Sequence, residues 1–437
     1  MFWPWAVRPL VAVTIGFGPI MRHPRYYAHG RAALVADVLA IAAGLLAAAG
    51  LLAAAGLLAA AGRRRSSPAR GRGWSAALFW LVLGLACVAG VATIRAAPEP
   101  RIDVFHLLQV SAAGLPHGAD MYRQQWAPSR ADYGVRGLFD VYPYLPWTTV
   151  VLAPFRLLLG DVRYGLLAAL AVAACCARRL AAPLGGAARA SEAGLAGAAP
   201  AVLPLLVVIF PESMYALQQS WTEPLLVACL AAMVLAVRGG HRRTAVLAFA
   251  LALASKQHVA LLLPVAAAWP AFGVRRTAVA AGSAALLVAP WVVAGPRDFV
   301  DDAVWTNLHY RVLAESLSVP GWASHVGVTL GFAPALVVLA GAYAAGWRAR
   351  GGAAGFCLGG ALVLAATALM NKQTFFNHYT LPMGLLVLAA VLLAVESTET
   401  VTDVTSAPAP VTAAPARGTA VPRPQRSVEN RSSDAPS

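Results

Sequence analysis

Long apolar segments alternate with short polar loops along most of this chain. From residue 74 onward the apolar runs cover residues 74–94, 162–178, 194–210, 223–237, 244–272, 277–295, 324–346, 353–370 and 379–395. About 20 apolar residues in a helix cross the hydrocarbon core of a bilayer. The pattern therefore predicts an all-α fold, a polytopic integral membrane protein with about ten to twelve transmembrane helices.

Composition favours the same environment, the lipid bilayer. The 437 residues are 59% hydrophobic and only 12% charged, and the mean hydropathy is +0.65. A soluble domain carries about 25% charged residues. The formal net charge of +15 does not indicate a nucleic-acid partner, because the arginines cluster in short loops between apolar runs. The preference for Arg and Ala over Lys is typical of a GC-rich bacterial genome, so the expected location is a bacterial plasma membrane.

The chain divides by composition into three parts. Residues 1–73 form an N-terminal extension in which GLLAAA occurs three times over residues 44–61, a low-complexity run long enough for a spanning helix. Residues 74–395 contain the main transmembrane domain. Residues 396–437 are rich in Pro, Ser, Thr and Ala, which predicts a disordered cytoplasmic tail.

Arginine-rich loops predict the orientation, because such loops stay on the cytoplasmic side. They cover residues 63–72, 178–189, 238–243, 275–276 and 348–350. Only one crossing then fits between residues 95 and 180. We place it at 162–178 and expect the proline-containing run 144–159 to be re-entrant or interfacial on the outer side. Residues 244–272 form an out-and-back pair with its apex at residues 255–258.

This orientation places the acidic residues and both lysines on the outer side. Of the thirteen acidic residues between residues 74 and 395, twelve fall there and only Glu192 is inside. The chain has two lysines, Lys256 and Lys372, against 32 arginines, and both lysines are also outside. Membrane insertion does not account for this asymmetry, so we expect a functional site on the outer face.

Short polar motifs recur at the outer ends of the predicted helices. Asp103 follows the first outward helix, and helical spacing places Asp103, His106 and Val110 on one face. Further along the chain come Gly118-Ala-Asp120-Met-Tyr122, Tyr142-Pro143-Tyr-Leu, Gln219-Ser-Trp-Thr-Glu223-Pro-Leu, Lys256-Gln-His258 and the stretch FFNHYTLP.

In their order and topology these motifs resemble the GT-C class of membrane glycosyltransferases, most closely the family 87, or DUF2029, type. Members use polyprenyl-phosphate sugars, usually mannose, outside the membrane. The resemblance implies a GT-C-like catalytic domain over residues 74–395, with a long first extracytoplasmic loop carrying re-entrant or juxtamembrane helices. It also implies that Asp103 is the general base that deprotonates a hydroxyl of a glycan or glycolipid acceptor. The chain departs from the family pattern at Tyr144, where members often have a second proline.

The chemistry implied by this resemblance assigns further residues. An inverting displacement needs a base on the acceptor and positive charge at the departing phosphate. The candidates for the donor phosphate are Lys256, Lys372, Arg311 and His378. Lysine suits this role because it is a compact, flexible point charge, and no metal or further cofactor is then required. The alternative role of both lysines is to cap the C-terminal carbonyls of the helices that they follow.

The remaining candidates would contact the sugar or the acceptor or shape the site. Sugar or acceptor contacts are expected from Gln219, Glu223, His258, Gln373 and His309. Asp120 and Tyr122 are expected to fix the first outer loop, and Asp140 is a second candidate for the base. The alternative function is a transporter or flippase for a lipid-linked or anionic solute. Such a protein needs charged groups near the bilayer midplane and paired broken helices, whereas the polar residues here gather at the outer ends.

Overall fold

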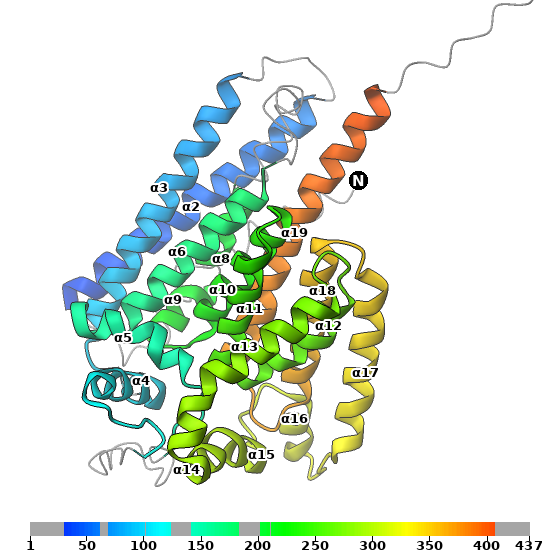
Figure 1. Ribbon diagram of the computed structural model, residues 1–437. Coiled ribbons are helices and arrows are strands. Elements are labelled where there is room, and N and C mark those ends of the chain that lie inside the picture. Colours follow the sequence, from blue (N-terminus) through cyan, green and yellow to red (C-terminus); the bar gives the residue numbers. More distant parts are fainter. Residues whose placement is uncertain are drawn as a thin grey trace, which may run out of the picture.

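The structure is a computed structural model that describes residues 30–61, 69–100, 102–123, 141–182, 202–209 and 211–406. Within these ranges the chain is helical and contains no strand (Figure 1). The helices long and apolar enough to cross a membrane are Gly30–Ala53, Ser75–Ala96, Gly273–Ala294, Phe332–Ala349, Ala353–Met370 and Phe376–Glu396. The fold is therefore that of a helical membrane protein.

The low-complexity repeat lies in helix α2 (Gly30–Ala61), which packs along α3 (Ala69–Ala96). Ala40, Ala43 and Ala47 are completely buried at this contact. Small side chains on a helix allow a neighbouring backbone to approach closely. The repeat therefore forms the helix expected from its length. Residues 1–29 and 62–68 of the N-terminal extension lie outside the described residues.

Helix α3 runs antiparallel to α6 (Arg163–Leu180). Near the end of α3, Ile94 O accepts a hydrogen bond from Arg163 Nη2. Near its start, Ala76 O accepts one from Arg178 Nη1. Helix α10 (Glu223–Arg238) finishes beside α6, because Arg238 Nη1 donates to Leu180 O over 2.6 Å. We call the end of the bundle that holds Arg178 and Arg238 the arginine end.

Helices α5 (Trp147–Leu159) and α6 are bent by 116° relative to each other. Gly160 between them has a left-handed backbone with φ of 82°, a conformation that glycine adopts without steric cost. The break falls between the two segments that the sequence analysis separated into a re-entrant or interfacial run and a crossing.

The crossing predicted at residues 194–210 falls mostly on residues 183–201 and Phe210, which lie outside the described residues. Its described part, residues 202–209, is helical, and short helical elements follow one another from Leu203 to Gln218. They are η4 (Leu203–Leu205), α8 (Leu206–Ile209) and α9 (Pro211–Gln218). Two prolines, Pro204 and Pro211, lie in this stretch, and each lacks a backbone N–H and disfavours helix in the residue before it.

The predicted apex at residues 255–258 is a break between α11 (Arg242–Ser255) and η5 (Gln257–Leu262), which leads into α12 (Leu263–Ala268). Lys256 itself is extended, with φ of −153° and ψ of 133°. Helices α10 and α11 are 16 and 14 residues long. Counting the bent α5–α6 pair as one span gives up to seven candidate spans, one of which, Gly30–Ala53, precedes the ten crossings predicted from residue 74 onward. The predicted crossings that are not candidate spans include those at α10, α11 and η5–α12, whose helices are short, and the one at residues 194–210, which lies mostly outside the described residues.

The C-terminal half contains the longest regular helices. Helix α18 (Ala353–Met370) has the predicted bounds, whereas α17 (Phe332–Ala349) begins later than predicted, after the short helix α16 (Val319–His325). Helix α19 (Phe376–Ser406) continues into the stretch that composition assigned to a tail. Residues 407–437 lie outside the described residues.

Two of these helices expose most of their apolar surface. In α13 (Gly273–Ala294) Leu286 is 76% exposed, and in α17 Phe332 is 75% exposed. Continuous apolar exposure along helices of this length is typical of a surface that faces lipid. These helices therefore provide part of the membrane-facing side of the bundle.

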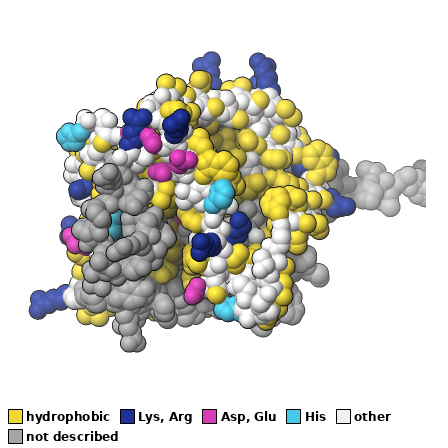
Figure 2. Space-filling model, turned by 90° about the horizontal axis from the view of Figure 1, so that it is seen from below, with side chains coloured by type: hydrophobic (Ala, Val, Ile, Leu, Met, Phe, Trp, Pro, Cys, Tyr) yellow, Lys and Arg dark blue, Asp and Glu magenta, His cyan; other side chains and the backbone are white. Residues whose placement is uncertain are grey.

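The end of the molecule opposite the arginine end carries several short helices. They are α4 (Asp103–Gly114), η1 (Leu115–His117), α14 (Pro296–Val300), the π-helix η6 (Asp301–Trp305), α15 (Thr306–His309) and α16, most of them at the bottom of Figure 1. We call this end the Asp103 end. Seen from below, it carries Lys, Arg, Asp, Glu and His side chains among hydrophobic ones (Figure 2).

Candidate functional site

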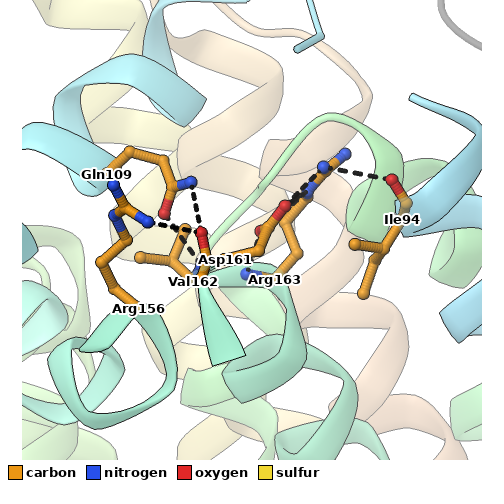
Figure 3. A network of polar contacts seen from close by, with 7 residues as sticks. Ile94, Gln109, Arg156, Asp161, Val162 and Arg163 are labelled. Carbon is orange, nitrogen blue, oxygen red and sulfur yellow. Dashed lines mark hydrogen bonds and ion pairs between the residues drawn. The ribbon is translucent and has the colours of Figure 1, made fainter. Parts of the chain in front are cut away.

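Helix α4, which begins at Asp103, is held against the bend between α5 and α6 (Figure 3). Gln109 of α4 donates from Nε2 to Gly160 O over 3.2 Å and accepts at Oε1 from Val162 N over 3.0 Å. Arg156 Nη1 donates to the same Gly160 carbonyl over 2.7 Å. The side chain of Gln109 therefore bonds two backbone groups of the bend, and these bonds fix the position of α4.

A buried ion pair adds to this attachment. Arg163 is fully buried and binds Asp161 through two nitrogens, with Nη2 2.6 Å from Oδ2 (Figure 3). The guanidinium carbon lies 4.7 Å from the ring centroid of Phe105 in α4. Asp161, one of the acidic residues expected on the outer face, is therefore a structural partner of Arg163.

Asp103 is the first residue of α4, and its side chain is partly buried. Its Oδ1 accepts a hydrogen bond from Val104 N over 2.8 Å. Burial raises the pKa of this carboxyl, and the backbone N–H of Val104 opposes that rise. An acid in the first turn also stabilises a helix, so Asp103 has a local structural role as well as the chemistry of a candidate base.

The negative charge of Asp103 acts on two tyrosines, Tyr144 and Tyr310. Burial raises the pKa of Tyr144, and the charges of Asp103 and Glu223 raise it further. Burial and the Asp103 charge also raise the pKa of Tyr310. Both phenols therefore stay protonated at neutral pH, and the two carboxylates act on one tyrosine ring.

Lys256 forms an ion pair with Glu223, the first residue of α10. The two residues are 8% and 1% exposed. Lys256 Nζ also lies 5.3 Å from the centroid of the Tyr144 ring, which is a cation–π distance. The Lys256 side chain thus bonds Glu223 rather than the carbonyls of α11 that the capping alternative predicted, and Glu223 is its carboxylate partner.

The chain on either side of Lys256 is tied to the loop that carries Tyr144. Gln257 Nε2 donates to Pro143 O over 2.9 Å and to Ala303 O over 2.8 Å. Thr148 Oγ1 donates to Ser255 O over 2.6 Å. These bonds explain why the apex predicted at residues 255–258 lies beside Tyr144.

Two histidines complete this cluster. Lys256 and His378 both lie within electrostatic range of His258, and Lys256 also lies within range of His378. His378, near the start of α19, accepts at Nδ1 from Phe375 N over 3.3 Å. We call Asp103, Tyr144, Glu223, Lys256, His258 and His378 the inner group.

The other basic candidates form a second set. Lys372 Nζ donates to Leu308 O over 3.2 Å, and Gln373 Nε2 donates to Arg311 O over 2.9 Å. His309 Nδ1 lies 2.9 Å from Trp305 O. We call Lys372, Gln373, His309 and Arg311 the loop group. Lys372 does not reach back to α18 as the capping alternative predicted; its amine bonds a carbonyl of α15 instead.

One residue within the loop group's segment, Tyr310, connects it to the inner group. Tyr310, whose pKa the Asp103 charge raises, stands between His309 and Arg311. Backbone hydrogen bonds hold the two segments of the loop group together, since Leu317 N donates to Thr374 O over 2.6 Å and Leu313 N to Lys372 O over 3.4 Å. The two rare lysines therefore lie at the same end of the molecule, in adjacent sets with separate contacts.

The two residues expected to fix the first outer loop contact each other. Asp120 Oδ1 accepts from Tyr122 N over 3.1 Å. Tyr122 OH in turn donates to Tyr144 O over 2.8 Å, so this loop supports the tyrosine of the inner group. Asp140, the second candidate for the base, lies outside the described residues.

Sequence reasoning missed several polar residues beside Glu223. It named Gln219 and Glu223, but Gln218, Ser220 and Thr222 are also buried. The signal was available, because LQQSWTEP places five polar side chains inside an apolar stretch. Tyr144 and Tyr310 were missed for another reason: only the fold brings them to Asp103.

Among the described residues, no group of three or more His, Cys, Asp or Glu side chains is placed to hold a metal ion. The inner group combines a carboxyl at Asp103 with a cation at Lys256, and the loop group adds the exposed cations Lys372 and Arg311.

These features define a helical membrane protein with a charged and aromatic cluster at one end of its bundle. No family model matches the chain, and neither the curated proteins nor the solved structures provide a match. Function is therefore inferred from the residues of the site and from the order of the motifs along the chain.

Proposed function

We propose that this protein is a membrane glycosyltransferase of the GT-C type. It transfers a sugar, with mannose as the first candidate, from a polyprenyl phosphate to an extracytoplasmic glycan or glycolipid. The observation that carries the proposal is the arrangement around Tyr144: the Asp103 charge acts on this ring, and Lys256 Nζ lies 5.3 Å from its centroid. A candidate base and a cation thus flank one aromatic side chain.

The proposed step is an inverting displacement. Asp103 takes the proton of the acceptor hydroxyl as its oxygen attacks the anomeric carbon. The bond from this carbon to the phosphate oxygen breaks, and the electron pair leaves with the polyprenyl phosphate. The raised pKa of Asp103 supports the role, because a carboxylate with a raised pKa is a stronger base than an ordinary one.

Positive charge for the departing phosphate comes from both sets of residues. Lys372 and Arg311 are exposed and can meet the phosphate first. Lys256, which is paired with Glu223, provides a cation from a deeper position, and the ring of His378 can donate a hydrogen bond to the phosphate there. Charge stabilisation of this kind is stronger where water is excluded.

The proposed orientation puts the arginine end in the cytoplasm and the Asp103 end outside a bacterial plasma membrane. Arg178 and Arg238 support it, since both lie at helix ends on one side of the bundle where the positive-inside bias places arginine. In this proposal the short helices α10 and α11, the apolar segment Leu203–Gln218 and the η5–α12 segment complete about ten crossings.

One observation favours a transporter as the second candidate. The Lys256–Glu223 pair is buried where the break after α11 meets the break before α10. Broken helices that meet at a buried charged site are typical of secondary transporters. This candidate predicts that the solute crosses the bilayer with its covalent bonds unchanged.

A reconstitution experiment separates the two candidates. Purified protein in liposomes is given radiolabelled polyprenyl-phosphate mannose and a glycolipid extract of bacterial membranes as acceptor. A transferase moves the label from the polyprenyl lipid to a new product. Label that stays on the polyprenyl lipid but reaches the opposite leaflet faster than in empty liposomes would instead establish the transporter.

A further inference from the structure

The connection between α9 and α10 has an unusual backbone. Ser220 has φ of 58°, and it is the one residue other than glycine with positive φ among the described residues. Such a conformation is disfavoured for a side chain with a Cβ, and it persists where surrounding contacts impose it. The turn from Gln218 to Glu223 is thus held in a strained form.

The same turn contains polar atoms that lack partners. The residues Gln218, Gln219, Ser220, Thr222 and Glu223 are at most 3% exposed. Each has a buried atom without a hydrogen-bond partner in the structure: Gln218 Oε1, Gln219 Nε2, Ser220 Oγ, Thr222 Oγ1 and Glu223 Oε2. Buried polar groups in native proteins are nearly always satisfied, so a run of such atoms indicates a missing polar ligand.

The hydroxyl of Thr222 makes no hydrogen bond to the helix that it precedes. Thr222 occupies the N-cap position of α10, where a threonine hydroxyl normally accepts from a backbone N–H of the first turn. Here the side chain makes no capping hydrogen bond, and Pro224 in the first turn has no N–H to offer. The hydroxyl is therefore buried without a hydrogen-bond partner.

The chemistry of the turn matches one class of ligand. Its free groups are two amides, two hydroxyls and one carboxylate oxygen, which together donate and accept hydrogen bonds but provide no cation. A phosphate would need positive charge, and a polyprenyl chain would leave the polar atoms unsatisfied. The hydroxyls of an uncharged sugar can bond every one of these groups.

We propose that the turn Gln218–Glu223 is the subsite that binds the hydroxyls of the donor sugar and makes the protein distinguish a glycosylated polyprenyl phosphate from the bare lipid. This subsite rests on the proposed function, and it adds Gln218, Ser220 and Thr222 to the residues assigned to sugar contacts, Gln219 and Glu223. The position supports the donor rather than the acceptor, because Glu223 is bonded to Lys256, which lies on the phosphate side of the reaction.

The test compares the affinities of two lipids for the full chain in detergent. The probes are a short-chain polyprenyl-phosphate mannose and the same polyprenyl phosphate without the sugar, and the method is isothermal titration calorimetry. The variants are Thr222→Val, which keeps the side-chain shape, and Ser220→Gly, which removes the hydroxyl and permits positive φ. Each should weaken binding of the glycosylated lipid by about 5- to 30-fold and leave binding of the bare lipid unchanged.

A matched control is Thr367→Val, since the Thr367 hydroxyl donates to Val363 O inside α18. It should bind both lipids as the wild type does. If both turn variants keep the full preference for the glycosylated lipid, the turn holds only internal water and the proposal fails. That result would leave the proposed function standing, whereas a wild-type protein that binds neither lipid would overturn both.

Discussion

At the scale of single residues, the Lys256–Glu223 pair is the contact with the clearest energetic consequence. Lys256→Met leaves Glu223, 1% exposed, with a buried carboxylate and no cation. Breaking a buried pair from one side costs about 3–5 kcal/mol. We therefore expect a large drop in the melting temperature of the purified protein, measured by fluorescence in detergent.

The double variant Lys256→Met with Glu223→Gln separates stability from function. With both charges removed, most of the lost stability should return. Sugar transfer should stay low in this variant, because the phosphate loses Lys256, its deeper cation, and keeps only Lys372 and Arg311. Recovery of full transfer would show that Lys256 serves the fold alone.

Residue identity could be predicted from the sequence better than residue pairing. The scarcity of lysine and the polar breaks in apolar runs were sufficient to select Lys256, Glu223 and His378. Their pairing depends on contacts across 33 residues in the case of Lys256 and Glu223, and no local pattern encodes such a distance. Tyr144 stood out in the sequence only as a departure from a family pattern. The structure places it within electrostatic range of Asp103 and Glu223 and at a cation–π distance from Lys256.

At the scale of elements, the loop before α5 depends on one acidic residue of η6. Asp302 Oδ2 accepts a hydrogen bond from Tyr142 N over 2.8 Å. Burial raises the pKa of Asp302 to about 6, the Tyr142 N–H opposes this rise, and the charges of Asp298, Asp301 and Asp120 add to it. The contact between this loop and η6 is therefore sensitive to pH.

The raised pKa of Asp302 predicts the direction in which the free energy of unfolding changes with pH. The unfolded chain releases the Asp302 proton near a pKa of about 3.9, so between that value and about 6 the folded state binds more protons. The free energy of unfolding then falls as pH rises through this window, by at most roughly 1.4 kcal/mol per pH unit. Thermal melts from pH 4 to 6 should show this slope in the wild type and a smaller one in Asp302→Asn. Equal slopes would contradict the assignment.

The turn from α17 to α18 depends on a glycine. A Cβ on Gly355 would lie 1.6 Å from Ala349 O, whereas one on Gly341 of α17 would meet nothing within 4 Å. Gly355→Ala should cost at least about 1–3 kcal/mol through this overlap. Gly341→Ala should stabilise the exposed helix by up to about 1 kcal/mol. Melting temperatures of both variants test the contact, and similar values for the two would refute it.

Helices whose apolar run ends at a polar break were predicted well, whether long or short. Helix α18 has the predicted bounds, and α10 (Glu223–Arg238) matches the predicted run 223–237 to one residue. Helix α17 begins at Phe332 rather than at the predicted residue 324, because Gly327, which has a positive φ, and Gly331 precede it. Apolar composition alone therefore does not locate the start of a helix.

At the scale of the whole molecule, the proposed orientation can be measured by cysteine labelling. Arg243 lies in the first turn of α11, and Glu315 lies in the segment between α15 and α16; both are exposed. In intact cells a membrane-impermeant maleimide should label Glu315→Cys and should label Arg243→Cys only after permeabilisation. The wild type, with its own five cysteines, provides the background. The reverse pattern would invert the topology and place Asp103 in the cytoplasm.

The membrane class and the gathering of Asp103, Lys256 and Lys372 at one end could be inferred from composition and charge. The bounds of α10 (Glu223–Arg238) and the break after α11 (Arg242–Ser255) also agree with the predicted run 223–237 and the predicted apex at 255–258. The sequence could not show that Lys256 and Lys372 belong to adjacent sets, one paired with Glu223 and the other bonded to Leu308.

The central claim is that Asp103 is the base for sugar transfer, and the Asp103→Asn variant tests it most directly. Initial rates are measured with radiolabelled polyprenyl-phosphate mannose for the wild type, Asp103→Asn and Glu99→Gln, whose exposed carboxylate lies four residues before Asp103. We predict that Asp103→Asn lowers the rate by about 10²- to 10⁴-fold with an unchanged melting temperature, while Glu99→Gln transfers as the wild type does. Full transfer by Asp103→Asn would contradict the account.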